Sequence, residues 1–137
     1  MDYEYLKNFI DKRNVTLISM VDEEGYPNTK AMLVPRRIED NVFFFTTNTS
    51  SQSIKIYEKN SKACIYFFEK GRFNYEGIML IGNMEICYDY ETKLSIWRDG
   101  DTLFYKNGVE DPDYCVLKFT AIKGRQYKNF KKKSFEL

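Results

Sequence analysis

Histidine is absent from the 137 residues of this chain. A chain without histidine cannot supply a Ser-His-Asp triad, a Cys-His pair, or a histidine ligand to a metal ion or a haem. The three cysteines, Cys64, Cys87 and Cys115, lie in separate apolar stretches without Cys-x-x-Cys spacing, and three thiols cannot form a four-thiolate site. We therefore expect no metal site, and reduced, buried thiols in a reducing compartment.

Long apolar runs and an excess of one charge are also missing. No stretch approaches the roughly 20 apolar residues of a membrane span, and residues 1–4 lack the basic and apolar regions of a signal peptide. The 21 basic and 20 acidic residues give a net charge of +1. We interpret the one basic cluster, Lys128 and Lys131 to Lys133, as a solvated end. These features predict a cytoplasmic protein that has neither nucleic acid nor an anionic membrane as a partner.

Aromatic residues, in contrast, are abundant. The chain has 11 Tyr and 11 Phe, and 43% of its residues are hydrophobic. This composition favours β-structure with a large buried surface, either a core or a subunit interface. The length fits a single domain over residues 1–137, and a chain of this size can build a core without disulfides.

The hydrophobic pattern predicts a mainly β fold with peripheral helices. Helical spacing and cap signals favour helices at 2–13, 51–59 and 90–98. Apolar β-rich runs between turn residues predict strands at 15–21, 29–37, 42–46, 62–69, 73–88 and 114–122. Gly77 and Gly82 are expected to be bulges or points of close approach. At least six strands with short turns favour a closed or partly closed barrel, and a five-stranded oligonucleotide-binding barrel is the main alternative.

The segment from Gly25 to Asn60 has the residues of an anion pocket. A strand with Lys30 lies one hairpin from a strand that ends in Thr46 and Thr47, and a serine-rich helix start at Ser51 follows. A helix N-terminus presents free N–H groups to a phosphate. The cations within reach are Lys30, Arg36, Arg37 and Lys55. On the residues alone, a simple helix cap with solvated bases is the favoured alternative, because caps are common and no Walker spacing is present.

The same segment resembles the FMN-binding region of the pyridoxamine-phosphate-oxidase-like split barrels, especially the general-stress-protein and nitroimidazole-resistance branches. The matching features begin with the hairpin residues Gly25 and Pro27, Lys30 on the second strand, and the aromatic strand that ends at Thr47. The helix start at Ser51 and its last residue, Asn60, follow. Downstream, the likeness continues at 81–86, Trp97, 104–105, Gly108 and 111–112. It covers nearly the whole chain.

The resemblance implies a homodimeric split β-barrel with flavin mononucleotide (FMN) in a groove between the subunits. Carried over by position, Lys30, Thr47 and Ser51 would hold the phosphate. The residues implied near the isoalloxazine ring are Met32, Leu33, Phe45 and Thr46.

Two positions depart from the family pattern. The family has a lysine two residues after the serine, where this chain has Ser53, and an arginine where it has Lys30. Lysine offers a point charge instead of a bidentate fork, so both changes weaken the phosphate site. Lys55 can compensate if its side chain folds back.

The resemblance implies an FMN-dependent oxidoreductase that passes a hydride from a reduced nicotinamide to a small planar acceptor. Two alternatives stay open: a non-enzymatic flavin-binding or stress module, and a dimeric scaffold or oligonucleotide-binding barrel without a cofactor. The catalytic residues are unknown, because Glu76 is a lone carboxylate and Trp97 is better explained as core or interface. Such a lack fits flavin chemistry, in which the cofactor carries the hydride.

Overall fold

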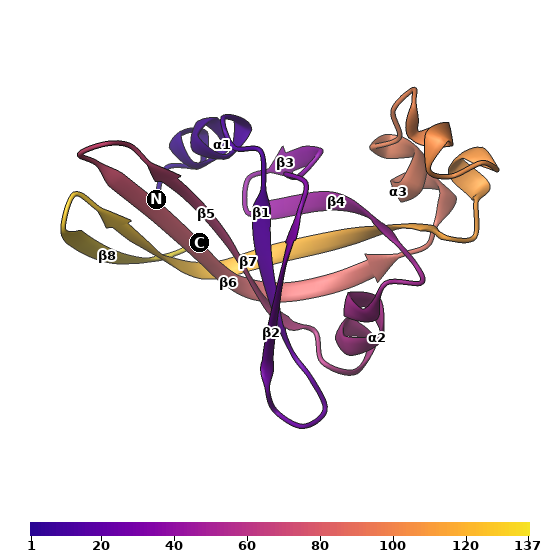
Figure 1. Ribbon diagram of the computed structural model, residues 1–137, viewed down its shortest axis with the longest axis horizontal. Coiled ribbons are helices and arrows are strands. Elements are labelled where there is room, and N and C mark those ends of the chain that lie inside the picture. The colour runs from indigo at the N-terminus through magenta and orange to yellow at the C-terminus, as the bar shows by residue number, and fades with distance from the viewer.

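A single antiparallel sheet of eight strands forms most of the computed structural model, which describes residues 1–137 (Figure 1). Its strands follow the order β2-β1-β5-β6-β7-β4-β3, and β8 pairs with β7. The sheet is not closed, as expected for a split barrel. The strands are β1 (Thr16–Val21), β2 (Pro27–Met32), β3 (Arg37–Glu39), β4 (Val42–Asn48), β5 (Lys62–Lys70), β6 (Tyr75–Cys87), β7 (Tyr114–Lys128) and β8 (Lys131–Glu136).

Three α-helices lie at the ends and faces of the sheet: α1 (Tyr3–Asp11), α2 (Gln52–Lys59) and α3 (Tyr90–Ser95). Two 3₁₀ turns, η1 (Asp101–Leu103) and η2 (Gly108–Glu110), connect α3 to β7. Each α-helix begins at a side-chain cap, since Asp2, Ser51 and Asp89 accept hydrogen bonds from backbone N–H groups of the first turn. None of the helices has the length and apolar character that a transmembrane span requires.

The edge of β7 opposite β6 is divided between two different strands. β4 pairs with residues 114–120 of β7 and β8 pairs with residues 123–128. The change of partner coincides with a β-bulge, where Ile81 and Gly82 of β6 pair with Lys123 and Ala121 and leave Ile122 unpaired. A Cβ atom on Gly82 would lie 2.0 Å from the Thr120 carbonyl oxygen. The predicted close approach at Gly82 is therefore confirmed, and it permits the bulge.

One face of the sheet carries the main core. The inward residues alternate along the strands as β-structure requires, and twenty buried residues form one cluster. Phe43, Phe45, Phe67 and Phe119 are among its largest members, and Leu6, Phe9 and Ile10 of α1 cover one end. Seven of the 23 aromatic side chains lie in this core, whereas nine are exposed, so the core accounts for only part of the aromatic-rich composition.

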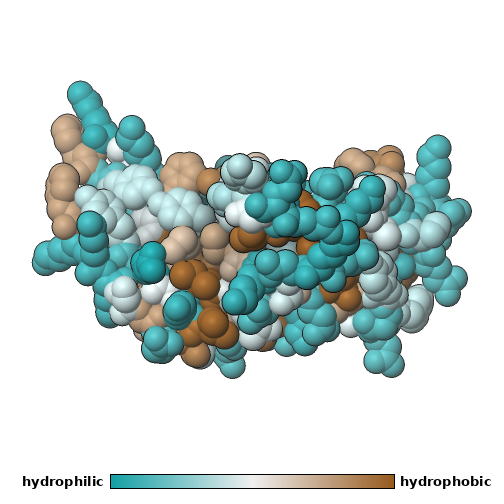
Figure 2. Space-filling view, turned by 90° about the horizontal axis from the view of Figure 1, so that it is seen from below, coloured by the Kyte–Doolittle hydropathy of each residue, from teal (hydrophilic) through white to brown (hydrophobic).

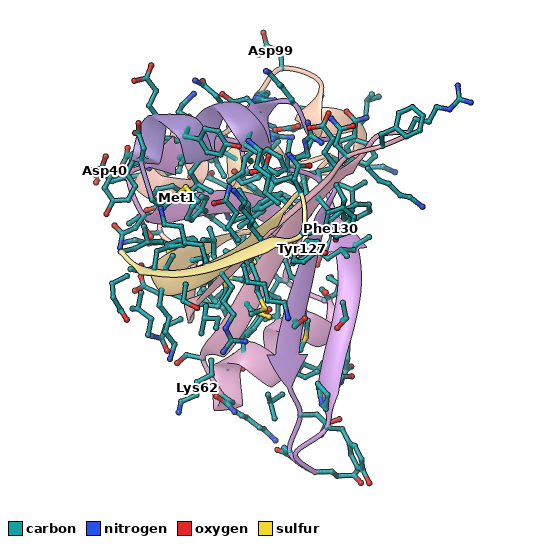
Figure 3. The ribbon with its side chains drawn as sticks, turned by 90° about the vertical axis from the view of Figure 1, so that its left-hand side faces the viewer. Met1, Asp40, Lys62, Asp99, Tyr127 and Phe130 are labelled. Carbon is teal, nitrogen blue, oxygen red and sulfur yellow. The ribbon has the colours of Figure 1, made fainter.

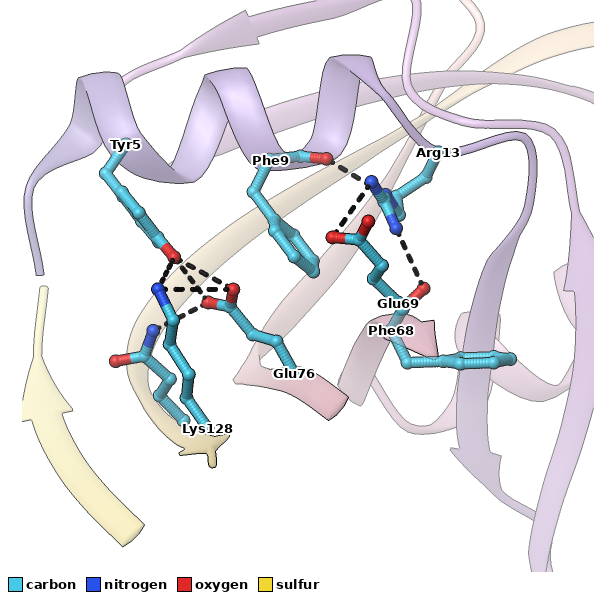
Figure 4. A network of polar contacts seen from close by, with 8 residues as sticks. Tyr5, Phe9, Arg13, Phe68, Glu69, Glu76 and Lys128 are labelled. Atoms are coloured by element: carbon cyan, nitrogen blue, oxygen red, sulfur yellow. Dashed lines mark hydrogen bonds and ion pairs between the residues drawn. The ribbon is translucent and has the colours of Figure 1, made fainter. Parts of the chain in front are cut away.

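Helix α1 is also held to the sheet by polar contacts (Figure 4). The Tyr5 hydroxyl donates to both carboxylate oxygens of Glu76, at 2.9 and 2.7 Å, and Gln126 donates to the same carboxylate at 2.7 Å. Lys128 donates to the Tyr5 oxygen at 3.0 Å. Glu76 is buried, so these partners satisfy a carboxylate that would otherwise be costly to desolvate. This gives Glu76 a structural role.

A second, smaller core forms between the sheet and the segment around α3. Its rings Trp97, Tyr105 and Tyr114 lie 5.0 to 6.2 Å apart, centroid to centroid. Arg36 closes this core by a bidentate ion pair with Asp101, at 2.5 and 2.8 Å, and donates to the Ile96 carbonyl at 3.1 Å. Trp97 is therefore a packing residue here, which is the interpretation favoured from the sequence.

Three expected boundaries were wrong. The strand expected at 29–37 is interrupted after Met32, because Pro35 cannot donate to a ladder and Arg36 turns to Asp101. The helix expected at 90–98 ends at Ser95. The last predicted strand extends to Lys128 instead of residue 122. Of the lysines interpreted as a solvated end, Lys128 therefore ends β7, and Lys131 to Lys133 lie in β8.

The Arg36–Asp101 pair predicts a specific loss of stability in acid. The Arg36 guanidinium holds the pKa of the Asp101 carboxyl below its ordinary value. The ionised Asp101 carboxylate therefore stabilises the folded state fully above the unfolded pKa of about 3.9. This stabilisation is lost as the pH falls through the lower pKa of the folded state. We expect Asp101→Asn to lower the free energy of unfolding at neutral pH by about 3 kcal/mol and to remove that part of the acid dependence.

Urea unfolding at several pH values measures this dependence. Glu39→Gln is the matched control, because Glu39 pairs with Arg37 on the exposed surface and should change stability by less than about 0.5 kcal/mol. Equal losses of stability from Asp101→Asn and Glu39→Gln would contradict the stabilising role that we assign to the Arg36–Asp101 pair.

Candidate functional site

Lys30 is placed on the core-facing side of β2, opposite Ile18 of β1 in the ladder. Cross-strand partners share one face of a sheet, and Ile18 is fully buried. The Lys30 ammonium reaches from this half-buried position to the N-terminus of α2, where it donates to the Ser51 hydroxyl oxygen at 3.0 Å. The structure thus joins two segments that the sequence predicted to converge.

Ser51 is the N-cap of α2 and the centre of a small hydroxyl cluster. Its oxygen accepts from the Ser53 backbone N–H at 3.3 Å, and the two hydroxyl oxygens are 2.8 Å apart. Ser53 is almost fully buried, so the position where the family has lysine holds a short hydroxyl against the cap. Lys30, Ser51 and Ser53 therefore form one continuous hydrogen-bonded group.

The electrostatics of this set favour an anion. Lys30 has no carboxylate within ion-pair distance, and the first turn of α2 contains no acidic residue. Burial lowers the pKa of the Lys30 ammonium, which is the effect of desolvating a charge that lacks a counter-charge. A cation in this state at the positive end of a helix dipole attracts a negative group.

The remaining residues implied by the resemblance differ in their accessibility. Thr47 and Phe45 lie on the core-facing side of β4, with Thr47 at the Ser51 end, and Thr46 lies on the other face. Phe45 is fully buried in the core, and Met32 packs against it from the end of β2. Leu33, just beyond β2, is 70% exposed. The Leu33 side chain is therefore free to contact a ring, whereas Phe45 could contribute only through its backbone.

The other cations are directed elsewhere. Arg36 is bound to Asp101, and Arg37 pairs with Glu39 and lies over the Phe44 ring. Lys55 is exposed and makes no ion pair; it lines a groove of about 650 Å³ between α2 and the β1–β2 hairpin. Three carboxylates of that hairpin, Asp22, Glu23 and Glu24, also line the groove. Lys30 is consequently the one cation of the four that contacts the α2 cap.

No group of three or more Cys, Asp or Glu side chains is arranged to hold a metal ion. Cys87 and Cys115 are buried and Cys64 is half-buried, and all three are free thiols. Burial raises the pKa of the Cys87 thiol to about 11, so it is protonated at neutral pH and a poor nucleophile. The arrangement supports binding of an anionic group more directly than acid–base or thiol chemistry.

Comparison with known proteins identifies the family. Residues 2–136 match the family model described as pyridoxamine 5'-phosphate oxidase like. The chain therefore belongs to this family, as its resemblance predicted. No curated protein matches the chain by sequence.

Solved structures agree with this assignment. A Clostridium acetobutylicum protein of the pyridoxinephosphate oxidase family, related to general stress protein 26, is 33% identical, with a TM-score of 0.85 over 100% of this chain and 97% of that one. A NimC/NimA family protein from the same organism shares the fold at 21% identity, TM-score 0.74, over 98% and 92% of the two chains. A haem-binding protein from Mycobacterium smegmatis shares it at 13% identity, TM-score 0.74, over 98% of this chain and 57% of that one.

We expect Lys30 to lower the stability of the unliganded protein. Its folded pKa is lowered, so the fold disfavours the ammonium at neutral pH, and this penalty is relieved as the pH rises toward the usual lysine value of about 10.4. We expect Lys30→Met to leave the melting temperature of the unliganded protein unchanged or to raise it. Differential scanning calorimetry in a buffer free of phosphate makes this measurement.

Ser51→Ala provides the contrast. It removes the cap of α2 and should lower the free energy of unfolding by about 1 kcal/mol. A larger loss of stability from Lys30→Met than from Ser51→Ala would show that Lys30 is a structural residue.

Proposed function

We propose that the protein binds FMN and that Lys30, Ser51 and Ser53 hold its phosphate at the N-terminus of α2. The observation that carries the proposal is the half-buried Lys30 ammonium, which has no carboxylate partner and donates to the cap of α2. A phosphate would accept from this ammonium and from the two hydroxyls, and it would lie at the positive end of the α2 dipole. Thr47 lies on the same face of the sheet and is the next donor along β4.

Membership of the pyridoxamine 5'-phosphate oxidase like family supports a flavin as the phosphate ligand. An isoalloxazine ring needs an apolar surface within reach of the phosphate site. Leu33 offers one side of such a surface, because it follows the strand that carries Lys30 and is largely exposed.

The second side of the ring site would come from another copy of the chain. The face of the sheet opposite the main core carries half-buried or exposed apolar residues on three adjacent strands. They are Leu17 on β1, Tyr66 and Phe68 on β5, and Met79 and Ile81 on β6. No helix covers these residues. We propose that this face forms a homodimer and that the ring lies at its border.

FMN, when bound, supplies hydride-transfer chemistry, and the chain supplies binding and exclusion of water. The chain has no histidine, and Lys30 has no carboxylate within ion-pair distance, so no proton donor or acceptor of either kind is bound to it. We propose an oxidoreductase that accepts reducing equivalents from a reduced nicotinamide and passes them to a small planar acceptor such as a nitroaromatic or a quinone. A non-enzymatic flavin-binding module is the second candidate, because it needs only the binding residues.

FMN binding should depend on Lys30 and not on Lys55. Removing a charge-assisted contact to phosphate costs about 1.5–3 kcal/mol, so Lys30→Met should weaken FMN binding by about 10- to 100-fold. Lys55→Met should change it less than threefold, because Lys55 is exposed and faces another groove. Quenching of FMN fluorescence during titration gives both dissociation constants, and riboflavin, which has no phosphate, should bind Lys30→Met and the parent protein alike.

Visible absorption spectra and turnover assays distinguish the oxidoreductase from the non-enzymatic flavin-binding module. Oxidation of NADH or NADPH by the FMN-loaded protein in the presence of a nitroaromatic supports the oxidoreductase, and FMN binding without turnover supports the module. Failure to bind FMN at all, or a haem spectrum in the purified protein, would overturn the proposal. A haem in this chain would need a ligand other than histidine, such as tyrosine, cysteine or methionine.

A further inference from the structure

The turns of two long hairpins meet at one end of the molecule, at the left of Figure 1. They are the β5–β6 turn, residues 71–74, and the β7–β8 turn, residues 129–130, and we call them together the hairpin end. The Asn129 N–H donates to the Tyr75 carbonyl at 3.2 Å, and the Tyr75 and Tyr127 rings lie 5.8 Å apart. These contacts fix the two turns side by side.

Each turn presents a phenylalanine to solvent. Phe73 is 87% exposed and Phe130 is 89% exposed, and no other large hydrophobic side chain of the chain is as exposed as these two. Figure 3 shows Phe130 next to Tyr127 as the hairpin end is viewed directly. In Figure 2, apolar atoms at this end, on the left, adjoin strongly hydrophilic side chains. The two rings therefore contribute almost nothing to the core.

Phe130 also strains the backbone. Asn129 and Phe130 have φ angles of 50° and 69°, the left-handed pair of a two-residue hairpin turn that favours Asn-Gly. A bulky residue at positive φ is an outlier, whereas glycine adopts this conformation freely. Stability alone would favour glycine at position 130. An exposed, strained phenylalanine at a turn points to a role outside folding.

The charge of the chain is concentrated at the same end. Residues 69–76 and 125–133 together contain seven basic and two acidic side chains, a net charge of +5. The whole chain has +1, so the remaining residues carry −4. One of the two acids, Glu76, is buried in the network with Tyr5. The near-neutral total, which predicted no anionic partner, therefore conceals a strongly basic end.

A protective role explains part of this pattern. Lysines on an edge strand prevent edge-to-edge pairing, and Lys131, Lys132 and Lys133 lie on β8, which pairs only with β7. This explanation does not account for Phe73 or for the strain at Phe130, since exposed apolar rings promote association.

We propose that the hairpin end attaches the protein reversibly to an anionic phospholipid surface. Apolar rings at turns enter the boundary between headgroups and acyl chains, and basic side chains around them contact lipid phosphates. Phe73 and Phe130 project freely from two adjacent turns, as insertion requires, and Lys70, Arg72 and Lys131 flank them. The two rings also line a groove of about 190 Å³ with Lys70 and Arg72. Stacking of single-stranded nucleic acid on these rings is the competing interaction that the experiment below must distinguish.

Co-sedimentation with lipid vesicles tests the attachment. The FMN-treated full chain is mixed with vesicles of phosphatidylcholine alone or of phosphatidylcholine with phosphatidylglycerol. We expect binding only to the anionic vesicles, and weaker binding at high salt, because salt screens exposed charges. Phe130→Gly should lower the partition coefficient by about tenfold or more, which is the effect of withdrawing one ring from the interface.

The variant Phe130→Gly distinguishes a loss of vesicle binding from a loss of folded protein. Relief of the strained φ angle should leave its melting temperature unchanged or raise it, so lost binding cannot be attributed to unfolding. Phe104→Ser and Lys106→Gln are matched controls at the opposite end of the molecule, where Phe104 is 79% exposed; they should bind vesicles as the parent does. The replacement of Lys131 and Lys133 by Gln should weaken binding and reduce its salt dependence.

Three results would overturn the proposal: no binding to anionic vesicles, binding that Phe130→Gly does not change, or tighter binding to single-stranded DNA that vesicles cannot displace. A fourth is a change from dimer to monomer when Phe73 or Phe130 is replaced, because the rings would then belong to a subunit interface. None of these results depends on FMN affinity, which the Lys30 titration measures separately.

Discussion

The split of the barrel depends on the close approach of β6 and β7 at Gly82. A side chain at this position would overlap the Thr120 carbonyl, so the bulge exists only because glycine occupies it. Beyond the bulge the free edge of β7 changes partner from β4 to β8. β4 leads directly into α2 and the Ser51 cap, and the turn between β7 and β8 forms one half of the hairpin end. The proposed phosphate site and this half of the hairpin end are thus positioned by one contact between two backbones.

The candidate site differs from the polar networks at the two cores in how its charged side chain is partnered. In the two polar networks that hold the fold, Arg36 is paired with Asp101, and Glu76 is bound by Tyr5, Gln126 and Lys128. The buried Lys93 has no carboxylate partner, but its ammonium donates to the Asp111 carbonyl and lies over the Tyr114 ring. Lys30 is half-buried and receives no such counter-charge. A protein selected for stability alone would pair or replace this lysine. Lys30 differs from these residues because its ammonium lies at a helix N-terminus, and this difference supports our proposal that it belongs to a binding site.

The sequence predicted the elements whose signals are local. Ser51 before a helical pattern and the apolar runs of β1, β5 and β6 were recognisable, and the meeting of Lys30 with Ser51 followed from one hairpin and one helix start. β8 was missed because its turn has Asn-Phe where Asn-Gly would signal a hairpin and because Lys131 to Lys133 resemble a solvated tail. The pairing of Arg36 with Asp101, 65 residues away, had no local signal at all. The same holds for the clustering of basic residues, which a total charge cannot reveal.

The position of Lys30 on an edge strand has a consequence for how a ligand and the fold affect each other. β2 pairs only with β1, so the hairpin that carries Lys30 has one free edge, and the Lys30–Ser51 and Glu23–Lys59 contacts join it to α2. An anion held between Lys30 and α2 would connect this hairpin to a helix that follows two strands later. The ligand would then act as a cross-link, and its departure would release the hairpin first. We therefore expect the backbone amides of β2 to exchange with solvent faster without the anion than with it. The exchange rate would then measure how fully the site is occupied, even for a colourless ligand.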